Sequence, residues 1–229
     1  MTADKKTETV QNRPFSYQKS LKERGNSFLE KCLGIERYIN RPLASLLVRA
    51  VFSTGITPNQ LTYLSFFLGL GAVASFSMGK PLFFVLGGIL IQLSSIVDCA
   101  DGMLARAKDM CSNYGSHLDL FLDRIIDLFL IAGIAAGFYI FSNNLTLFIL
   151  GIFSAALYLL QINLFYITKS FLGDDSRGET GETRALMLFF IFILAVVNRL
   201  DIIIYFLFVE TAINNLVRLI HFILLGRKN

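Results

Sequence analysis

Charged residues are scarce in this sequence, and tryptophan is absent from it. Asp, Glu, Lys and Arg make up 17% of the 229 residues, against about 25% in an average soluble domain. Hydrophobic residues make up 54%, and the mean hydropathy is +0.59. A soluble fold of this length could not bury so much apolar surface, whereas lipid solvates it directly. The composition therefore predicts a single integral membrane domain.

Cysteine is also rare, and its placement excludes two classes of site. Cys32, Cys99 and Cys111 are odd in number and no two of them have metal-ligand spacing, so neither a disulfide framework nor a zinc site is predicted. Residues 1–26 lack an apolar run. We therefore expect a flexible polar tail there and no N-terminal signal peptide, with the first membrane span acting as its own insertion signal.

An amphipathic stretch follows the tail, over residues 27–55. Apolar side chains recur in it at helical spacing, on both sides of a cap-like start at Asn40 and Pro42. These side chains are Phe28, Leu29, Cys32, Leu33, Ile39, Leu43, Leu46, Leu47 and Ala50. The pattern fits a helix lying in the cytoplasmic membrane interface. An ordinary connector helix fits it equally well, and both interpretations stay open.

Six apolar segments fill the rest of the chain, which we assign to one membrane domain over residues 56–229. They lie near residues 57–77, 82–104, 115–141, 145–169, 184–198 and 201–224. Each is about long enough for a ~30 Å hydrocarbon core at about 1.5 Å per residue, although the fifth is short. The predicted fold class is an all-α integral membrane protein, with six transmembrane helices preceded by an amphipathic interfacial helix.

Basic residues are distributed unevenly between the two sides of these spans. One side carries the Lys and Arg residues of the N-terminal region and then Arg106, Lys108, Lys169, Arg177, Arg184, Arg227 and Lys228, whereas the other carries Lys80 and Arg199. The positive-inside rule places the first set, and with it both termini, in the cytoplasm. Such a basic N-terminal region is attracted to anionic membrane lipid. Nucleic acid is not an expected partner, because these cations are interspersed with acids and lead into membrane spans.

Four aspartates cluster at the facing ends of the second and third spans. Asp98 and Asp101 are three residues apart, and Asp119 and Asp123 are four apart, so each pair shares a helix face. The loop between the two spans is short, which makes the helices antiparallel neighbours. All four carboxylates are therefore expected to converge on one pocket at the cytoplasmic end.

Such a group of acids needs protons or cations to neutralise it. Oxygen ligands favour Mg²⁺, with Mn²⁺ or Ca²⁺ as alternatives, and two ions would balance four charges. This arrangement suits phosphoryl transfer. Gly102, Ala105 and Gly115 have almost no side chain, which would let a flat base and a pyrophosphate approach the backbone. Arg106 follows the last of the small residues in its span and can pair with phosphate.

The run from Asp98 to Asp123 resembles the signature of the CDP-alcohol phosphotransferase family, D-x₂-D-G-x₂-A-R-x₈-G-x₃-D-x₃-D. All eight fixed positions match at the family spacing: Asp98, Asp101, Gly102, Ala105, Arg106, Gly115, Asp119 and Asp123. The family also has six spans behind an N-terminal interfacial helix, so the resemblance covers about residues 28–229.

The resemblance implies that a CDP-linked donor binds with its pyrophosphate on the metal ions, that an acceptor hydroxyl attacks, and that CMP leaves. It implies that Asp98, Asp101 and Asp119 are metal ligands and that Asp123 is the general base, which can also touch metal. Residues Gly102, Ala105, Arg106 and Gly115 would shape the CMP pocket. Pro58, Asn59 and Thr62 resemble a family run near the nucleotide, although a plain helix start explains them equally well. A homodimer is implied as well.

The acceptor alcohol is less well defined by the sequence. Arg124, Lys169 and Arg184 are candidate contacts for an anionic acceptor, although membrane topology alone also explains the last two. The stretches Arg37–Leu43 and Ile56–Thr62, together with Asp123, Arg124 and Asp127, resemble the inositol-phosphate branch of the family more than the glycerophosphate branch.

Two other functional classes compete with the transferase. Intramembrane aspartates also line the paths of cation and proton transporters, but transport does not require this spacing of Gly, Ala and Arg, and transporter acids tend to lie near mid-membrane. A non-catalytic scaffold would tolerate Asp123→Asn without loss of function.

Overall fold

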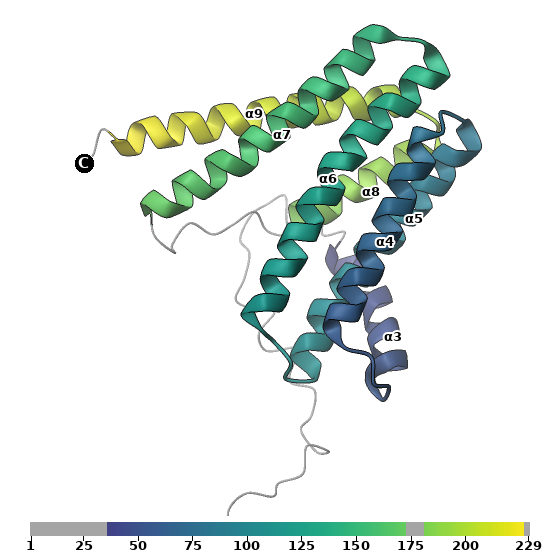
Figure 1. Ribbon diagram of the computed structural model, residues 1–229, viewed down its shortest axis with the longest axis vertical. Coiled ribbons are helices and arrows are strands. Elements are labelled where there is room, and N and C mark those ends of the chain that lie inside the picture. Colours follow the sequence, from purple (N-terminus) through teal and green to yellow (C-terminus); the bar gives the residue numbers. More distant parts are fainter. Residues whose placement is uncertain (1–35, 173–180, 227–229) are drawn as a thin grey trace, which may run out of the picture. The chain divides into compact units, whose positions relative to one another are not determined.

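The computed structural model describes residues 36–172 and 181–226, with the side chains at 168–172, 181–183, 221 and 224–226 outside the description. The predicted tail, the first part of the amphipathic stretch and Arg177 lie outside the described residues. The described residues form a short π-helix, η2 (Glu36–Asn40), followed by α-helices. These are α3 (Arg41–Phe52), α4 (Pro58–Ser77), α5 (Pro81–Ala107), α6 (Asn113–Ser142), α7 (Leu145–Leu172), α8 (Gly181–Val196) and α9 (Leu200–Gly226) (Figure 1).

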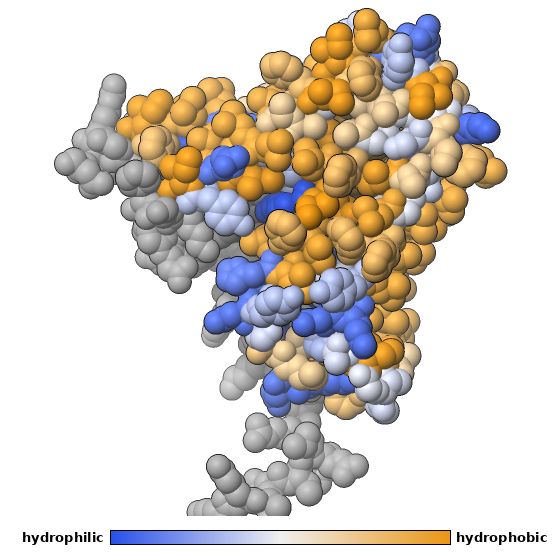
Figure 2. All heavy atoms as spheres, viewed as in Figure 1, coloured by the Kyte–Doolittle hydropathy of each residue, from blue (hydrophilic) through white to orange (hydrophobic). Residues whose placement is uncertain are grey.

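Five of these helices, α4, α5, α6, α7 and α9, are long and apolar enough to cross a membrane. The predicted all-helical class is therefore confirmed in the described part of the chain, and the five long apolar helices are consistent with a multi-pass membrane protein. Figure 2 shows apolar side chains over most of the visible face, with hydrophilic residues gathered mainly in the lower part of the view, where α6 begins. Helix α8 is different, because its apolar part covers only Arg184–Val196, or about 20 Å at 1.5 Å per residue.

The helix ends follow local sequence signals. Thr57 and Gln60 form a capping box around Pro58 at the start of α4, which satisfies backbone donors that the first turn leaves unpaired. Ser112 caps α6 by accepting a hydrogen bond from the Gly115 backbone amide at 3.0 Å. At the other end of α6, Asn143 adopts a left-handed conformation with φ 53°, which asparagine tolerates better than most residues. The start of α4 and both ends of α6 are therefore set by local sequence.

Helices α4 and α6 pack with almost no space between them. A Cβ atom on Gly137 would lie 1.8 Å from the Phe76 carbonyl oxygen, and one on Gly69 would lie 2.9 Å from Ile126 Cγ2. Small residues allow such close backbone approach between membrane helices. Helix α5 packs against the other side of α4, and α7 lies along α9 (Figure 1). The contacts between α4 and α6 thus fix the position of α6 along the bundle.

Helix α3 is buried on one face only. Ala44 and Val48 pack with Leu104 of α5 in a small apolar cluster, whereas Leu46 and Phe52 are exposed. Just before α3, the buried Asn40 side chain donates to Ser95 Oγ at 2.9 Å and accepts from Gln92 Nε2 at 2.8 Å. This one-sided burial is compatible with both interpretations of the amphipathic stretch.

Candidate active site

The end of α5 and the start of α6 bring three aspartates together. Asp98, Asp119 and Asp123 each offer a carboxylate oxygen, and these oxygens lie within 4.8 Å of one another. All three residues are partly buried. We call these residues the carboxylate cluster. The structure thus brings together three of the four aspartates that the sequence places in one pocket.

The fourth aspartate, Asp101, is held separately. It is 6% exposed, and its Oδ2 accepts a hydrogen bond of 2.5 Å from the Thr62 hydroxyl. Thr62 is itself buried in α4, so this contact joins a third helix to the motif. Asp101 follows Asp98 by three residues on α5 and lies outside the group of three oxygens that could share one ion.

The carboxylate cluster fits a hard divalent cation. Asp98 Oδ1 and Asp119 Oδ1 are buried and have no hydrogen-bond partner among the described residues. A buried carboxylate oxygen without a partner is costly, and a metal ion is one group that would satisfy it. The donors are all carboxylate oxygens, the set that Mg²⁺ and Mn²⁺ accept.

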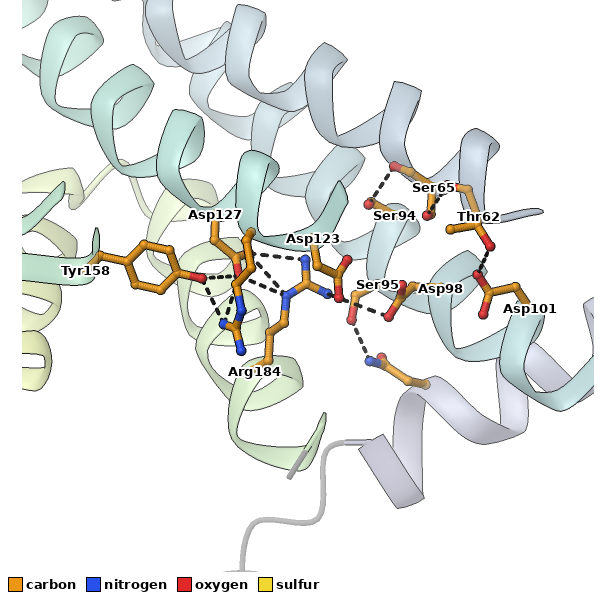
Figure 3. A network of polar contacts seen from close by, with 12 residues as sticks. Thr62, Ser65, Ser94, Ser95, Asp98, Asp101, Asp123, Asp127, Tyr158 and Arg184 are labelled. Atoms are coloured by element: carbon orange, nitrogen blue, oxygen red, sulfur yellow. Dashed lines mark hydrogen bonds and ion pairs between the residues drawn. The ribbon is translucent and has the colours of Figure 1, made fainter. Parts of the chain in front are cut away.

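Arg184 of α8 lies against this cluster. Its Nη1 is 3.0 Å from Asp123 Oδ2 and 3.6 Å from Asp98 Oδ2. Its Nη2 and Nε reach Asp127 instead, at 3.1 Å from Oδ1. Figure 3 shows the guanidinium between Asp127 on one side and Asp123 and Asp98 on the other. The sequence marks Arg184 only as a candidate acceptor contact, whereas the structure pairs it with three acids.

Asp127 is the centre of a second group of polar side chains, which we call the Asp127 network: Arg124, Asp127, Tyr158 and Arg184. The Asp127 side chain is 1% exposed. Its Oδ2 accepts a hydrogen bond from the Tyr158 hydroxyl at 2.7 Å, and the same hydroxyl accepts one from Arg124 Nη1 at 2.9 Å. Arg124 Nη1 also lies 3.8 Å from Asp127 Oδ2. The network joins α6, α7 and α8.

Sequence reasoning missed Tyr158 altogether. One signal was available, because a tyrosine inside an apolar span needs a partner for its hydroxyl. The signal does not identify that partner, since Asp127 lies 31 residues away on another helix.

The residues expected around the nucleotide lie beside these aspartates. A Cβ atom on Gly102 would meet Arg106 Nη1 at 3.4 Å, and one on Gly115 would meet Asn59 Oδ1 at 3.1 Å. Arg106 is exposed, Ala105 is half-buried and Pro58 is buried at the first turn of α4. Asn59 of α4 therefore faces Gly115 of α6. Lys169 lies in α7, and its side chain is outside the described residues.

Comparison with known sequences decides the family. The sequence model described as CDP-alcohol phosphatidyltransferase matches residues 55–221. The chain belongs to this family. The matched range contains every motif residue from Asp98 to Asp123 and all five long apolar helices apart from the end of α9.

Several curated proteins resemble this member of the CDP-alcohol phosphatidyltransferase family. An archaetidylinositol phosphate synthase of Pyrococcus horikoshii is 30% identical over 154 residues, which cover 67% of this chain and 77% of that protein. A bifunctional IPC transferase and DIPP synthase of Archaeoglobus fulgidus is 32% identical over 150 residues, 65% of this chain but 26% of that protein. The corresponding Thermococcus kodakarensis protein is 40% identical over 93 residues, 41% of this chain and 20% of its own length. The chain thus spans about a quarter or less of the two bifunctional relatives.

A solved structure shares the fold. The Mycobacterium tuberculosis phosphatidylinositol phosphate synthase, crystallised in complex with manganese and citrate, superposes with a TM-score of 0.61 at 22% sequence identity. The match covers 79% of this chain and 87% of that one. The helical arrangement described above is therefore shared with a protein of known structure.

Proposed function

We propose that the chain transfers a substituted phosphate group from a CDP-linked donor to the hydroxyl of a small polar alcohol, releasing CMP. One observation carries this proposal: the family motif brings the oxygens of Asp98, Asp119 and Asp123 within 4.8 Å of one another. In the reaction, the acceptor oxygen forms a bond to the donor phosphorus distal to cytidine. The bond from that phosphorus to the CMP oxygen breaks, and the acceptor proton passes to the protein.

The four motif aspartates are proposed to hold one or two divalent ions, Mg²⁺ or Mn²⁺. A bound ion would neutralise the pyrophosphate oxygens and stabilise the departing CMP. Thr62 supports this role, because its hydrogen bond of 2.5 Å to Asp101 Oδ2 fixes the orientation of that motif carboxylate. The buried oxygens of Asp98 and Asp119 that have no hydrogen-bond partner support it as well.

Asp123 is proposed as the general base. A base must lie within hydrogen-bond reach of the proton that it removes, and Asp123 is the motif acid closest to Arg184, at 3.0 Å. Arg184, Arg124 and Lys169 are the proposed contacts for an anionic acceptor. An acceptor phosphate that approaches Arg184 would therefore place its alcohol beside the Asp123 carboxylate.

Gly102, Ala105, Arg106 and Gly115 are proposed to form the CMP pocket, with Pro58, Asn59 and Thr62 on its α4 side. The space above Gly102 supports this assignment, since the nearest atoms to a Cβ there belong to the flexible Arg106 side chain. A planar base could approach the backbone at this position. Arg106 would then pair with a donor phosphate.

The favoured acceptor is an inositol phosphate. The support comes from the relatives of the chain, which include archaetidylinositol phosphate synthases and a phosphatidylinositol phosphate synthase. We further propose that α8 is a short sixth span, that η2 and α3 lie in the cytoplasmic interface, that the active site and both termini face the cytoplasm, and that the chain forms a homodimer.

An acceptor panel tests the reaction. Purified protein is given CDP-diacylglycerol or an ether-linked counterpart, Mg²⁺, and inositol, inositol phosphate, glycerol phosphate or serine, and CMP release is measured. We expect CMP release that requires metal and is fastest with inositol phosphate. Asp123→Asn should lose nearly all turnover. The matched control is Asp201→Asn, which changes an acid that pairs with the exposed Arg199 outside the motif. Cation flux in vesicles without CMP release from any pair would support a transporter instead.

A further inference from the structure

We propose that Arg184 is the internal counter-ion of the carboxylate cluster, and that Asp127 is a positioning residue which, by holding Arg184 from the opposite side, sets how tightly the cluster binds a divalent cation. This inference rests on the proposed function, because it assigns a control of metal affinity to the same site. Asp127 lies outside the eight fixed positions of the motif.

Arg184 divides its donors between Asp127 and the carboxylate cluster. Nε and Nη2 face Asp127, each at 3.1 Å, whereas Nη1 faces Asp123 at 3.0 Å and Asp98 at 3.6 Å. A guanidinium presents its donors in a rigid plane. Movement of the group toward Asp127 therefore takes Nη1 away from the carboxylate cluster, and movement toward the cluster weakens the contacts with Asp127.

Arg184 and a divalent ion would compete for the same carboxylate oxygens. A divalent ion needs carboxylate oxygens of Asp98 and Asp123, and Arg184 Nη1 lies against Oδ2 of both residues. A positive charge at this distance also repels an incoming cation. Arg184 therefore opposes metal binding in proportion to how closely it approaches the cluster.

Asp127 is buried and held in place by neighbouring helices. Its side chain is 1% exposed, and it accepts a hydrogen bond from Tyr158 on α7 as well as the contacts from Arg184 on α8. Tyr158 also accepts a hydrogen bond from Arg124, which lies three residues before Asp127. These contacts keep the Asp127 carboxylate in one position, so its attraction on Arg184 acts from a fixed direction.

The experiment measures Mn²⁺ binding without nucleotide or acceptor, by calorimetry or by electron paramagnetic resonance of free Mn²⁺, on the purified full chain. Arg184→Gln should bind Mn²⁺ about tenfold more tightly, and Asp127→Asn about tenfold more weakly, a size typical of coupling between neighbouring charged groups. The double variant should match Arg184→Gln, because Asp127 acts through Arg184. Asp201→Asn is the control, since it removes the charge of an acid outside the carboxylate cluster. Asp201 pairs with Arg199, and the distance between Asp201 Oδ2 and Arg199 Nη2 is 2.9 Å.

Opposite shifts in the two single variants support the inference. Weaker Mn²⁺ binding in Arg184→Gln, an unchanged affinity in Asp127→Asn, or a double variant that matches Asp127→Asn overturns it. If Asp127→Asn does not fold, Asp127→Glu is measured in its place. The longer glutamate side chain keeps the charge and pushes Arg184 toward Asp123. Asp127→Glu should therefore also weaken Mn²⁺ binding. If wild-type protein binds no Mn²⁺ and releases no CMP, the proposed function fails. Wild-type binding and turnover without the opposite shifts contradict this inference alone.

Discussion

Thr62 donates its hydroxyl hydrogen to Asp101 Oδ2 at 2.5 Å, across 39 residues of sequence and between two helices. The hydroxyl also lies 3.3 Å from the Pro58 carbonyl oxygen one turn earlier in α4. Both Thr62 and Asp101 are buried. The orientation of a motif carboxylate on α5 therefore depends on a side chain that lies outside the motif.

Replacement of Thr62 by valine tests this dependence. Valine keeps the branched shape but removes the donor, and the loss of a hydrogen bond to a buried charged group costs about 1.5–3 kcal/mol. We expect CMP release to fall about tenfold or more, measured as kcat/KM for the CDP-linked donor. Thr62→Ser keeps the hydroxyl and should retain most of the activity. Equal loss in both variants would contradict a role for the hydrogen bond.

Removal of one carboxylate from the cluster should weaken metal binding. Asp119→Asn converts the carboxylate into an uncharged amide. One oxygen of this carboxylate, Oδ1, has no hydrogen-bond partner among the described residues. We expect Mn²⁺ to bind at least about tenfold more weakly, measured by titration of purified protein. Asp109→Asn is the matched control, because Asp109 is exposed and lies outside the cluster. Its φ of 55° suits asparagine as well as aspartate. An unchanged affinity in Asp119→Asn would remove this residue from the metal site.

Gly102→Ala tests nucleotide binding at this position without disturbing the fold. The atoms nearest to the added Cβ belong to the flexible Arg106 side chain, at 3.4 Å or more, and alanine is the better helix former by about 1 kcal/mol. The thermal midpoint should therefore stay the same or rise. If the nucleotide packs on this backbone, KM for the CDP-linked donor should rise about tenfold, as for a loss of roughly 1.4 kcal/mol of binding. An unchanged KM would place the nucleotide elsewhere.

Gly137→Ala should destabilise the protein. The added methyl would lie 1.8 Å from the Phe76 carbonyl oxygen, so the α4 and α6 backbones must separate. Overpacking of this kind costs about 1–3 kcal/mol or more, which corresponds to a fall of about 2–12 °C in the thermal midpoint. Gly71→Ala in α4 is the control, because its Cβ makes only an ordinary contact of 3.5 Å with Leu90. Similar midpoints for the two variants would refute the close contact.

The helices were largely predictable because their signals are local. The segment expected near 115–141 is found at Asn113–Ser142, and the one near 82–104 at Pro81–Ala107. Apolar length sets the body of each helix, and residues such as Pro81 and Asn143 set its ends. Convergence of Asp98, Asp119 and Asp123 was predicted, and the structure brings these three together. The packing behind it was predicted wrongly, because α5 and α6 do not pack along each other as antiparallel neighbours but lie on different sides of α4.

The partners of those acids were not predictable. Arg184 follows Asp127 by 57 residues, and Tyr158 follows it by 31. No local spacing relates residues on α6, α7 and α8, because their contact depends on how three helices pack. The sequence assigns Arg184 by its charge near a span end, which does not reveal that its guanidinium faces acids. Whether it also meets the acceptor stays a prediction.

The close contact between Gly137 and Phe76 has a consequence for the membrane around the protein. Bilayers differ in thickness, and a helix adapts to a thicker or thinner one by changing its tilt. Because the α4 and α6 backbones touch at this point and Gly69 meets Ile126 further along, the two helices must tilt together as one rigid pair. The distance between Asn59 and Gly115 should therefore stay the same in bilayers of different lipid composition. Turnover should depend little on acyl-chain length.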